Sequence, residues 1–320
     1  MEVSPDAGSA RARPGRGTGI LLLAAALLFA AGPACAQDLE PRRWSHLPIG
    51  LNVLGLGAGT TDGEIFLDPV LQIDDGEVEY FSFGASYVRA FEWLGRSNRI
   101  DVRLPYARGR WEGSRAGEPI STRRHGFADP SLRWSIALYG APPLSGREWQ
   151  AYRAANPVTT TVGAAITVVL PWGEYFPDRL INLGSNRYIV RTQLGVLHQR
   201  HEWQFELTGS MSWYEDNDDY FGGRLLERDP LAFLQGHLIR DLGKGRWISA
   251  SGGYSWGGET AVDGNLSNNN DRTRFFALGY GFPLSPRQAM KITLVHADTN
   301  INVGARTNSL LLGWSVSWAD

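Results

Sequence analysis

Cysteine and lysine are nearly absent from this chain. Its 320 residues include one cysteine, Cys35, and two lysines, Lys244 and Lys291, so almost every basic residue is an arginine or a histidine. A single cysteine can form neither an intrachain disulfide nor a cysteine-based metal site. The charges nearly balance, with 31 Lys and Arg against 33 Asp and Glu, so the chain has no excess of basic residues with which to bind nucleic acid. We therefore expect no disulfide, no cofactor and no nucleic-acid partner.

Long apolar runs are also lacking, apart from a short one near the N-terminus. The apolar stretch 20–31 follows a basic region at 11–16 and precedes the Ala-Cys-Ala pattern at 34–36. This order predicts a secretory signal peptide over residues 1–36 and export by the general secretory route. The run is too short to cross a bilayer as a helix. A disordered tail, or a lipid anchor on Cys35, is a less favoured interpretation.

Motifs for catalysis or metal binding are missing as well. The sequence has no G-x-S-x-G elbow, phosphate-binding loop or dinucleotide fingerprint. None of the six histidines has metal-ligand spacing, and the pair His198 and His201 is predicted to be surface. The acidic cluster 215–219 could bind divalent cations or bridge to lipopolysaccharide, but it lacks the remaining positions of a calcium loop, which favours solvated acids. We predict that the protein is not an enzyme, and a barrel-embedded hydrolase is the least favoured alternative.

What the sequence does contain is a period-two alternation of apolar and polar residues, clearest over 158–170, 203–214 and 309–318. Such alternation is typical of strands with one apolar face. The segments are mostly 10–13 residues long, which exceeds the usual soluble strand of about 5–6 residues and suits a tilted membrane strand of about 9–11 residues with an extension. We predict twelve strands, near residues 49–60, 78–91, 98–106, 130–139, 158–171, 187–198, 203–214, 230–242, 247–257, 273–283, 287–298 and 307–318.

The connections between these segments alternate in length. Four are short, at 92–97, 199–202, 243–246 and 284–287, whereas five are long and polar, at 61–77, 107–129, 172–186, 215–229 and 258–272. Short periplasmic turns and long outer loops are typical of outer-membrane barrels, and an even strand count places both ends in the periplasm. The connection 140–156 is the exception, because it should be a periplasmic turn but is long enough to hold a short helix over 148–155.

Polar side chains within the strands favour a barrel in lipid over a soluble sandwich or soluble barrel. A transmembrane barrel is apolar outside and polar inside, and closure leaves no unpaired strand edge. We predict a closed antiparallel transmembrane β-barrel of about 12 strands. Its lumen or permeation candidates are Arg99, Asp101, Arg103, Arg133, Arg191, Gln193, Gln204, Glu206 and Arg274. Lumen filling by ion pairs is an alternative role for these residues.

Tryptophans should mark the two membrane interfaces. Trp203 and Trp213 share one face of a strand and lie ten residues apart. At about 3.3 Å per residue and a tilt near 40°, they are separated by roughly 25 Å along the membrane normal. This separation matches two aromatic girdles, and we assign Trp314 and Trp318 to the same role.

Four stretches resemble an outer-membrane family named for the MetA pathway of phenol degradation. They are Gly126-Phe127-Ala128-Asp129-Pro130 with Leu132-Arg133, then Arg153-Ala154-Ala155-Asn156-Pro157, Leu170-Pro171-Trp172-Gly173-Glu174-Tyr175 and Leu180-Ile181-Asn182-Leu183-Gly184. The resemblance extends over essentially the whole chain after residue 36. It implies an outer-membrane barrel that moves small hydrophobic or aromatic compounds and carries no catalytic motif. One departure is that Ala319 and Asp320 follow Trp318, where such barrels usually end on an aromatic residue.

These observations predict a passive outer-membrane channel or transporter for small molecules, with aromatic or hydrophobic compounds as the candidate solutes. The expected partners are outer-membrane lipid, lipopolysaccharide, the barrel-assembly machinery and a small solute, and nothing in the sequence indicates an oligomer. Residues 37–48, with Arg42, Arg43 and Trp44, are predicted to form an N-terminal periplasmic segment or plug, and 49–320 the barrel. Because twelve strands fall between filled eight-stranded barrels and open porins, a plugged structural or adhesive barrel acting through its outer loops is the alternative.

Overall fold

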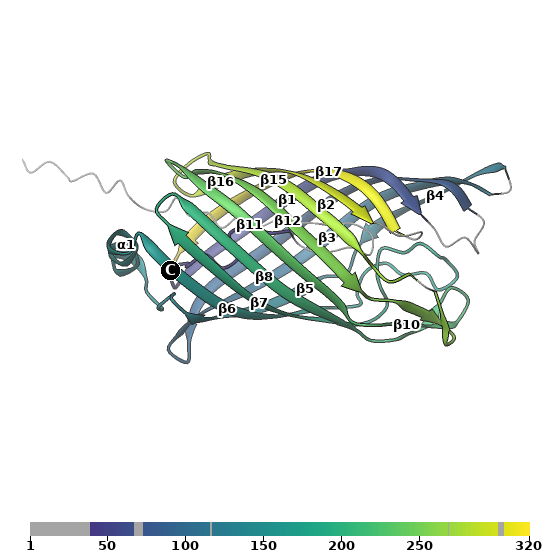
Figure 1. The fold of residues 1–320 in the computed structure, drawn as a ribbon, viewed down its shortest axis with the longest axis horizontal. Helices are drawn as coiled ribbons and strands as arrows, with labels where there is room; N and C mark the ends of the chain where they lie inside the picture. Colours follow the sequence, from purple (N-terminus) through teal and green to yellow (C-terminus); the bar gives the residue numbers. More distant parts are fainter. Residues whose placement is uncertain (1–38, 67–72, 116, 268, 300–303) are drawn as a thin grey trace, which may run out of the picture.

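The chain forms a closed antiparallel barrel of twelve strands in a computed structural model that describes residues 39–66, 73–115, 117–267, 269–299 and 304–320 (Figure 1). Each barrel strand pairs with its neighbour along the chain, and β1 pairs with β17 to close the ring. The barrel strands are β1 (Leu51–Phe66), β2 (Ile73–Trp93), β3 (Arg96–Arg115), β5 (Ser131–Tyr139), β6 (Val158–Val169), β7 (Ile189–Arg200), β8 (Trp203–Tyr214), β11 (Leu231–Gly243), β12 (Arg246–Gly257), β15 (Thr273–Pro283), β16 (Gln288–Thr299) and β17 (Gly304–Ala319).

All twelve predicted strands are confirmed, but several predicted outer loops contain further strand. Within the range 61–77, β1 continues to Phe66 and β2 already begins at Ile73, and within 107–129, β3 continues and β4 (Glu118–Phe127) pairs with it. A second sheet forms in the ranges 215–229 and 258–272, from β9 (Asn217–Tyr220), β10 (Arg224–Arg228), β13 (Thr260–Val262) and β14 (Asn265–Leu266). The prediction failed there because the polar residues of strands that extend outside the bilayer cannot be distinguished from the polar residues of a loop.

The two ends of the barrel differ as predicted. One end carries tight turns, such as that between β2 and β3, where Leu94 and Gly95 both have positive φ (52° and 68°). Positive φ at both central residues suits a two-residue hairpin turn that matches the strand twist. The same end carries α1 (Gly146–Ala155) and the C-terminus, whereas β4 and β10 lie at the other end (Figure 1). The predicted short helix is thus confirmed, with its start two residues earlier. No helix in the described residues is long and apolar enough to cross a membrane.

Large apolar side chains cover the outside of the barrel. Leu194, Phe276 and Leu278 are 64%, 59% and 61% exposed, whereas the inward Asp101 and Glu206 are 1% and 3% exposed. This distribution is the reverse of a soluble protein, in which exposed residues are mostly polar. It is the arrangement expected of a barrel whose outer surface faces lipid.

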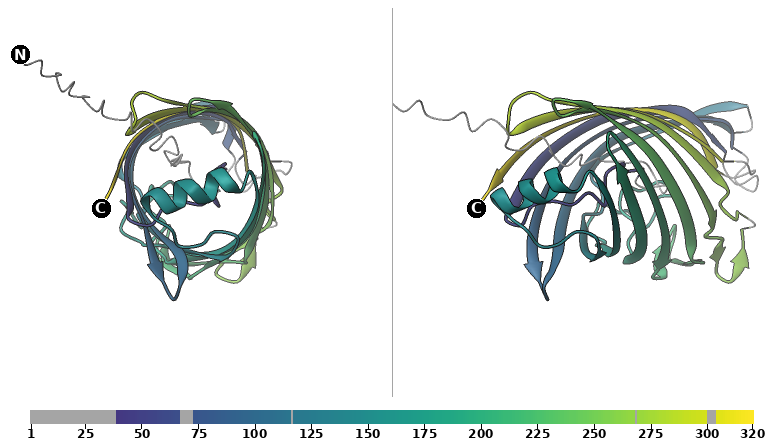
Figure 2. Two further views of the ribbon diagram at one scale, coloured as in Figure 1. Left: turned by 90° about the vertical axis from the view of Figure 1, so that its left-hand side faces the viewer. Right: turned by 60° about the vertical axis from the view of Figure 1, so that its left-hand side comes forward.

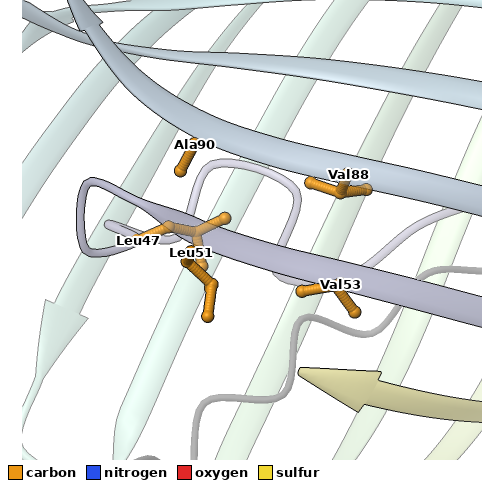
Figure 3. Close-up of a cluster of buried hydrophobic side chains, with 5 residues drawn as sticks. All are labelled: Leu47, Leu51, Val53, Val88 and Ala90. Carbon is orange, nitrogen blue, oxygen red and sulfur yellow. The ribbon is translucent and has the colours of Figure 1, made fainter. Parts of the chain in front are cut away.

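A small apolar cluster anchors the chain as it enters the first strand. Leu47 packs against Leu51 and Val53 of β1 and against Val88 and Ala90 of β2, all of them buried (Figure 3). Leu54 and Leu56 of β1 are exposed, so the buried cluster lies on the opposite face, the inner wall, near the periplasmic turns. It fixes the point from which residues 39–46 run into the barrel.

Candidate permeation pathway

Charged and polar side chains from β3, β5, β7 and β8 meet on one side of the barrel interior. Arg99 donates to both oxygens of Asp101, with Nε 2.9 Å from each. Arg133, which pairs with Asp101 across β3 and β5, places its Nη1 3.7 Å from that carboxylate and donates from Nε to Gln193 at 3.0 Å. Because two arginines surround one aspartate, this wall is positive apart from Glu206.

Residues 39–48 lie against this wall and complete its polar contacts. The Arg43 backbone N–H donates to Glu206 Oε1 at 3.2 Å, and the Trp44 indole N–H donates to Thr208 at 2.8 Å, both from buried groups. Glu40 forms ion pairs with Arg43, at 2.7 Å, and with Arg103 of β3. A buried charge is tolerated only when it is paired and hydrogen-bonded. The segment therefore supplies partners that the wall would otherwise need from water.

Two glycines form a notch for Trp44. Gly163 of β6 and Gly195 of β7 are paired across the two strands. A Cβ atom would lie 2.4 Å from the Trp44 ring at the first position and 1.9 Å from its Nε1 at the second, so only glycine admits the indole here. The Arg133 guanidinium carbon lies 5.1 Å from the ring centroid, within the range of a cation–π contact. Trp44 is consequently 5% exposed.

The other side of the segment contacts the opposite strands. Leu39 packs with Phe233 of β11 and with Phe275 and Ala277 of β15. Arg42 lies 5.5 Å from the ring of Trp247, and Lys291 lies at the same distance from that ring. The segment therefore bridges the lumen, because its side chains reach walls that face each other across the barrel.

The periplasmic mouth is covered by α1. Figure 2 (left) looks along the barrel and shows the helix lying across the opening. His46 packs edge-on against Trp149 and Tyr152 of the helix, with ring centroids 6.1 and 5.5 Å apart, and donates from Nε2 to the Pro142 carbonyl at 2.8 Å. Burial lowers the pKa of His46, and the charge of Arg153 adds to the shift, so both disfavour the charged form of the ring. The helix is thus fastened to the inserted segment.

Little space remains between the segment and the wall beneath α1. A cavity of about 50 Å³ is lined by Trp44, Ser97, Asn98, Ile136 and Thr161, among others. Ligand pockets usually measure about 300–1,000 Å³, and a single water needs about 10–15 Å³ by this kind of measure. The gap therefore has room for a few waters but for no ring-sized solute in this conformation.

At the outer end, the loop between β6 and β7 folds inward and is held by one carboxylate. Asp129 accepts hydrogen bonds from the backbone N–H of Gly173 at 2.9 Å and of Ser185 at 2.7 Å, and from the Ser185 hydroxyl at 2.5 Å. Glu174 N–H donates to the Phe127 carbonyl at 2.8 Å. The Gly184 N–H in turn donates to the Glu174 carbonyl at 2.9 Å, so these bonds join three of the four stretches singled out in the sequence into one structure.

The loop carries apolar side chains to the inner wall. Ile181 and Leu183 pack against a buried cluster that includes Tyr80 and Trp111 from β2 and β3. Arg124 of β4 donates to the Ile181 carbonyl at 2.9 Å and so fixes the same stretch. The outer half of the interior is therefore partly apolar, in contrast to the charged wall below it.

Comparisons with known proteins agree with this architecture. The family model described as "Putative MetA-pathway of phenol degradation" matches residues 58–318. The chain belongs to this family. No curated protein sequence matches it.

Solved structures share the fold of this family member. An outer membrane channel from Pseudomonas putida F1 is similar with a TM-score of 0.74 and 19% identity, over 88% of this chain and 100% of the channel. The transport unit of an Escherichia coli autotransporter is similar with a TM-score of 0.50 and 9% identity, over 92% and 95% of the two chains. At such identities the likeness shows a common barrel fold.

The structure places eight of the nine lumen candidates of the family member on the inner face. Besides those already described, Gln204 is buried and Arg191 donates to Ser212 at 3.0 Å. Arg274 was placed wrongly, because it is exposed and shares the outward face of β15 with Phe276 and Leu278. Both faces of β15 are largely apolar, so alternation could not tell them apart; Phe275, Ala277 and Gly279 are the residues that face inward there.

The four girdle tryptophans lie on the outside. Trp203 and Trp213 are 38% and 43% exposed at opposite ends of β8, and Trp318 is 41% exposed. Trp314 is half-buried and donates to Gln288 at 3.2 Å. Their girdle role stays a prediction, as does any effect of the terminal Asp320 on insertion. Asp320 itself accepts from Asn52 at 3.1 Å and pairs with Arg89 at 2.7 Å across the closure of the barrel.

Other sequence predictions fall elsewhere or remain untested. The proposed signal peptide lies outside the described residues. Within the part of the chain that is described, no group of three or more His, Cys, Asp or Glu could hold a metal ion. Sequence reasoning missed Glu40, Thr208 and the glycine pair 163 and 195. The signal that could have indicated a docking notch is that Gly163 and Gly195 both fall at inward positions of adjacent strands.

Proposed function

We propose that this protein is an outer-membrane channel for the passive passage of small molecules, and that residues 37–48 are its plug. The observation that carries the proposal is the set of buried hydrogen bonds from Arg43 and Trp44 to Glu206 and Thr208. Water can replace these polar contacts when the segment leaves the lumen, so release costs mainly the apolar contacts of Leu39, Trp44 and Leu47. The precursor is exported by the general secretory route and inserted by the barrel-assembly machinery.

We propose small aromatic or hydrophobic compounds as the solutes. The family description refers to phenol, which is aromatic. The inward cluster of Tyr80, Trp111, Ile181 and Leu183 offers apolar surface near the outer mouth, and aromatic rings stack favourably on one another. Below it, the arginines near Asp101 present donors to a hydroxyl or carboxylate substituent.

Single-channel conductance of refolded protein in a planar bilayer tests the channel. A chain that begins at residue 37 should be mostly closed, and a chain that begins at residue 49 should show stable steps, because the segment bridging the lumen is gone. In the shortened chain, Arg103→Ala and Arg191→Ala should each lower the preference for anions, since each removes an inward positive charge. Silence of every variant, together with unchanged uptake of phenolic compounds by cells lacking the protein, would refute the proposal.

A plugged barrel that acts through its outer loops is the second candidate. It is favoured by the filling of the barrel from both ends, by residues 39–48 on one side and by the 172–186 loop on the other. The same conductance series separates the two candidates, because a structural or adhesive barrel stays closed when residues 37–48 are removed.

A further inference from the structure

Four basic residues form a compact block on the outside of β3 and β4, beyond the lipid-facing band. Arg108 lies directly opposite His125, and Arg110 lies directly opposite Arg123, in antiparallel register. Arg108, Arg123 and His125 are exposed, and the Arg110 side chain is 41% exposed. We call Arg108, Arg110, Arg123 and His125 the β3–β4 basic block. Residues in direct register have Cβ atoms about 4.5–5.5 Å apart.

The charges of this block are poorly neutralised by the protein. Arg110 is ion-paired with Glu112 at 2.6 Å, and Glu79 lies opposite it on β2. Within the described residues, the side chains of Arg108, Arg123 and His125 have neither a hydrogen bond nor an ion pair. Like charges directly opposite each other in a sheet are destabilising. The block is therefore suited to binding an anion from outside the chain.

A basic residue elsewhere on the same outer surface is treated differently. Arg306 of β17 is ion-paired with both Asp298, at 3.1 Å, and Glu64, at 3.5 Å. Elsewhere on this surface, acidic neighbours therefore do neutralise an arginine. The basic block differs because, in the part of the chain that the structure describes, its ion pair is that of Arg110 with Glu112.

The block borders the apolar band of the barrel. One step below Arg108 and His125, Tyr106 and Phe127 form another direct pair, with ring centroids 5.4 Å apart, and Phe127 is 61% exposed. On β2, Phe81 lies opposite Arg108 and is 46% exposed. A ligand bound to the block and to these rings would have an anionic head and an apolar body. A free phosphate would contact the basic block but not the aromatic rings.

We propose that the β3–β4 basic block binds the phosphate groups of a phosphorylated glycolipid in the outer leaflet, with its acyl chains against Tyr106, Phe127 and Phe81. Arginine suits this role because its planar guanidinium can donate two parallel hydrogen bonds to one phosphate. Since β4 pairs only with β3 and is not a barrel strand, Arg123 and His125 can be replaced without opening the barrel wall.

The test is binding of diphosphorylated lipid A to the refolded barrel in detergent, measured by native mass spectrometry. Arg108→Gln/Arg123→Gln should lower the affinity about tenfold or more, because each lost charge-assisted bond costs a substantial part of the interaction. Arg200→Gln/Arg246→Gln removes two exposed arginines at the periplasmic end and should bind as the wild type does. Equal affinity of the first pair and this control would overturn the proposal.

Further arms distinguish the ligand source and guard against misfolding. Lipid A stripped of its phosphates should bind no better to the wild type than to the Arg108→Gln/Arg123→Gln variant. Complete displacement of lipid A by millimolar inorganic phosphate would assign the block to a soluble anion and overturn the lipid proposal. Arg123→Gln/His125→Gln confines the change to β4, outside the barrel wall, and should still weaken lipid A binding several-fold; unchanged binding there would also count against it.

Discussion

Replacing Gly195 by alanine should release the N-terminal segment from the lumen. The added methyl group would lie 1.9 Å from Trp44 Nε1 and 2.2 Å from the next ring atom, far inside van der Waals contact. The indole has little room to move away, because Gly163 touches the same ring closely and Arg133 lies 5.1 Å from its centroid. Either the strands shift or Trp44 leaves its notch.

The response that costs less free energy sets the size of the effect. Overpacking by a methyl group costs about 1–3 kcal/mol. Complete loss of Trp44 burial would cost about 5 kcal/mol, for roughly 200 Å² at 25 cal/mol per Å². The docked form should therefore lose about 1–3 kcal/mol. At 1.36 kcal/mol per tenfold change, the ratio of docked to released segment falls about 5- to 150-fold.

Thiol labelling measures this ratio directly. The only natural cysteine is Cys35, so a chain that begins at residue 37 and carries Ser45→Cys has a single reporter in the segment. Maleimide labelling of Ser45→Cys should accelerate about 5- to 150-fold when Gly195→Ala is added, if release precedes labelling. The matched control is Gly209→Ala in β8, where a Cβ meets nothing within 4 Å. Equal labelling rates for the two glycine variants would show that Trp44 is not held by the notch.

Three further predictions concern other contacts of the same interior. Glu206→Gln should weaken docking by about 1.5–3 kcal/mol, because it removes a buried charged acceptor of the Arg43 N–H, and the Ser45→Cys labelling rate should rise; an unchanged rate contradicts this. Asp129→Asn should loosen the loop between β6 and β7, and trypsin should then cleave faster after the exposed Arg179. Cleavage as slow as in the wild type would show that the hydrogen bonds of Asp129 do not hold this loop. Acidification from pH 7.5 to 5.5 should speed the labelling of Ser45→Cys. The pKa of His46 is lowered in the docked state, so the docked state loses stability as the pH falls below about 6.5. His46→Asn should remove this pH dependence, and a pH dependence that persists in this variant would show that another group titrates.

Period-two alternation was sufficient to determine the barrel wall. The twelve strands follow from it because a strand that faces lipid on one side and water or polar groups on the other must alternate, and because hydrocarbon permits no unpaired edge. The inward placement of Arg99, Asp101 and Glu206 follows for the same reason. On β15 both faces are apolar, and the same rule misplaced Arg274.

The sequence suggested residues 37–48 as a plug, but only the tertiary structure decided which contacts hold the material inside the barrel. The contacts of Trp44 with Gly195 and Thr208 join residues more than 150 positions apart, and no local pattern encodes such a pairing. The same holds for Asp129, whose partners Gly173 and Ser185 come from a loop that returns to it after β5 and β6. The wall repeats one local rule along every strand and is therefore readable from the sequence. The interior depends on which side chains meet after the ring has closed, and that is set by register and close packing.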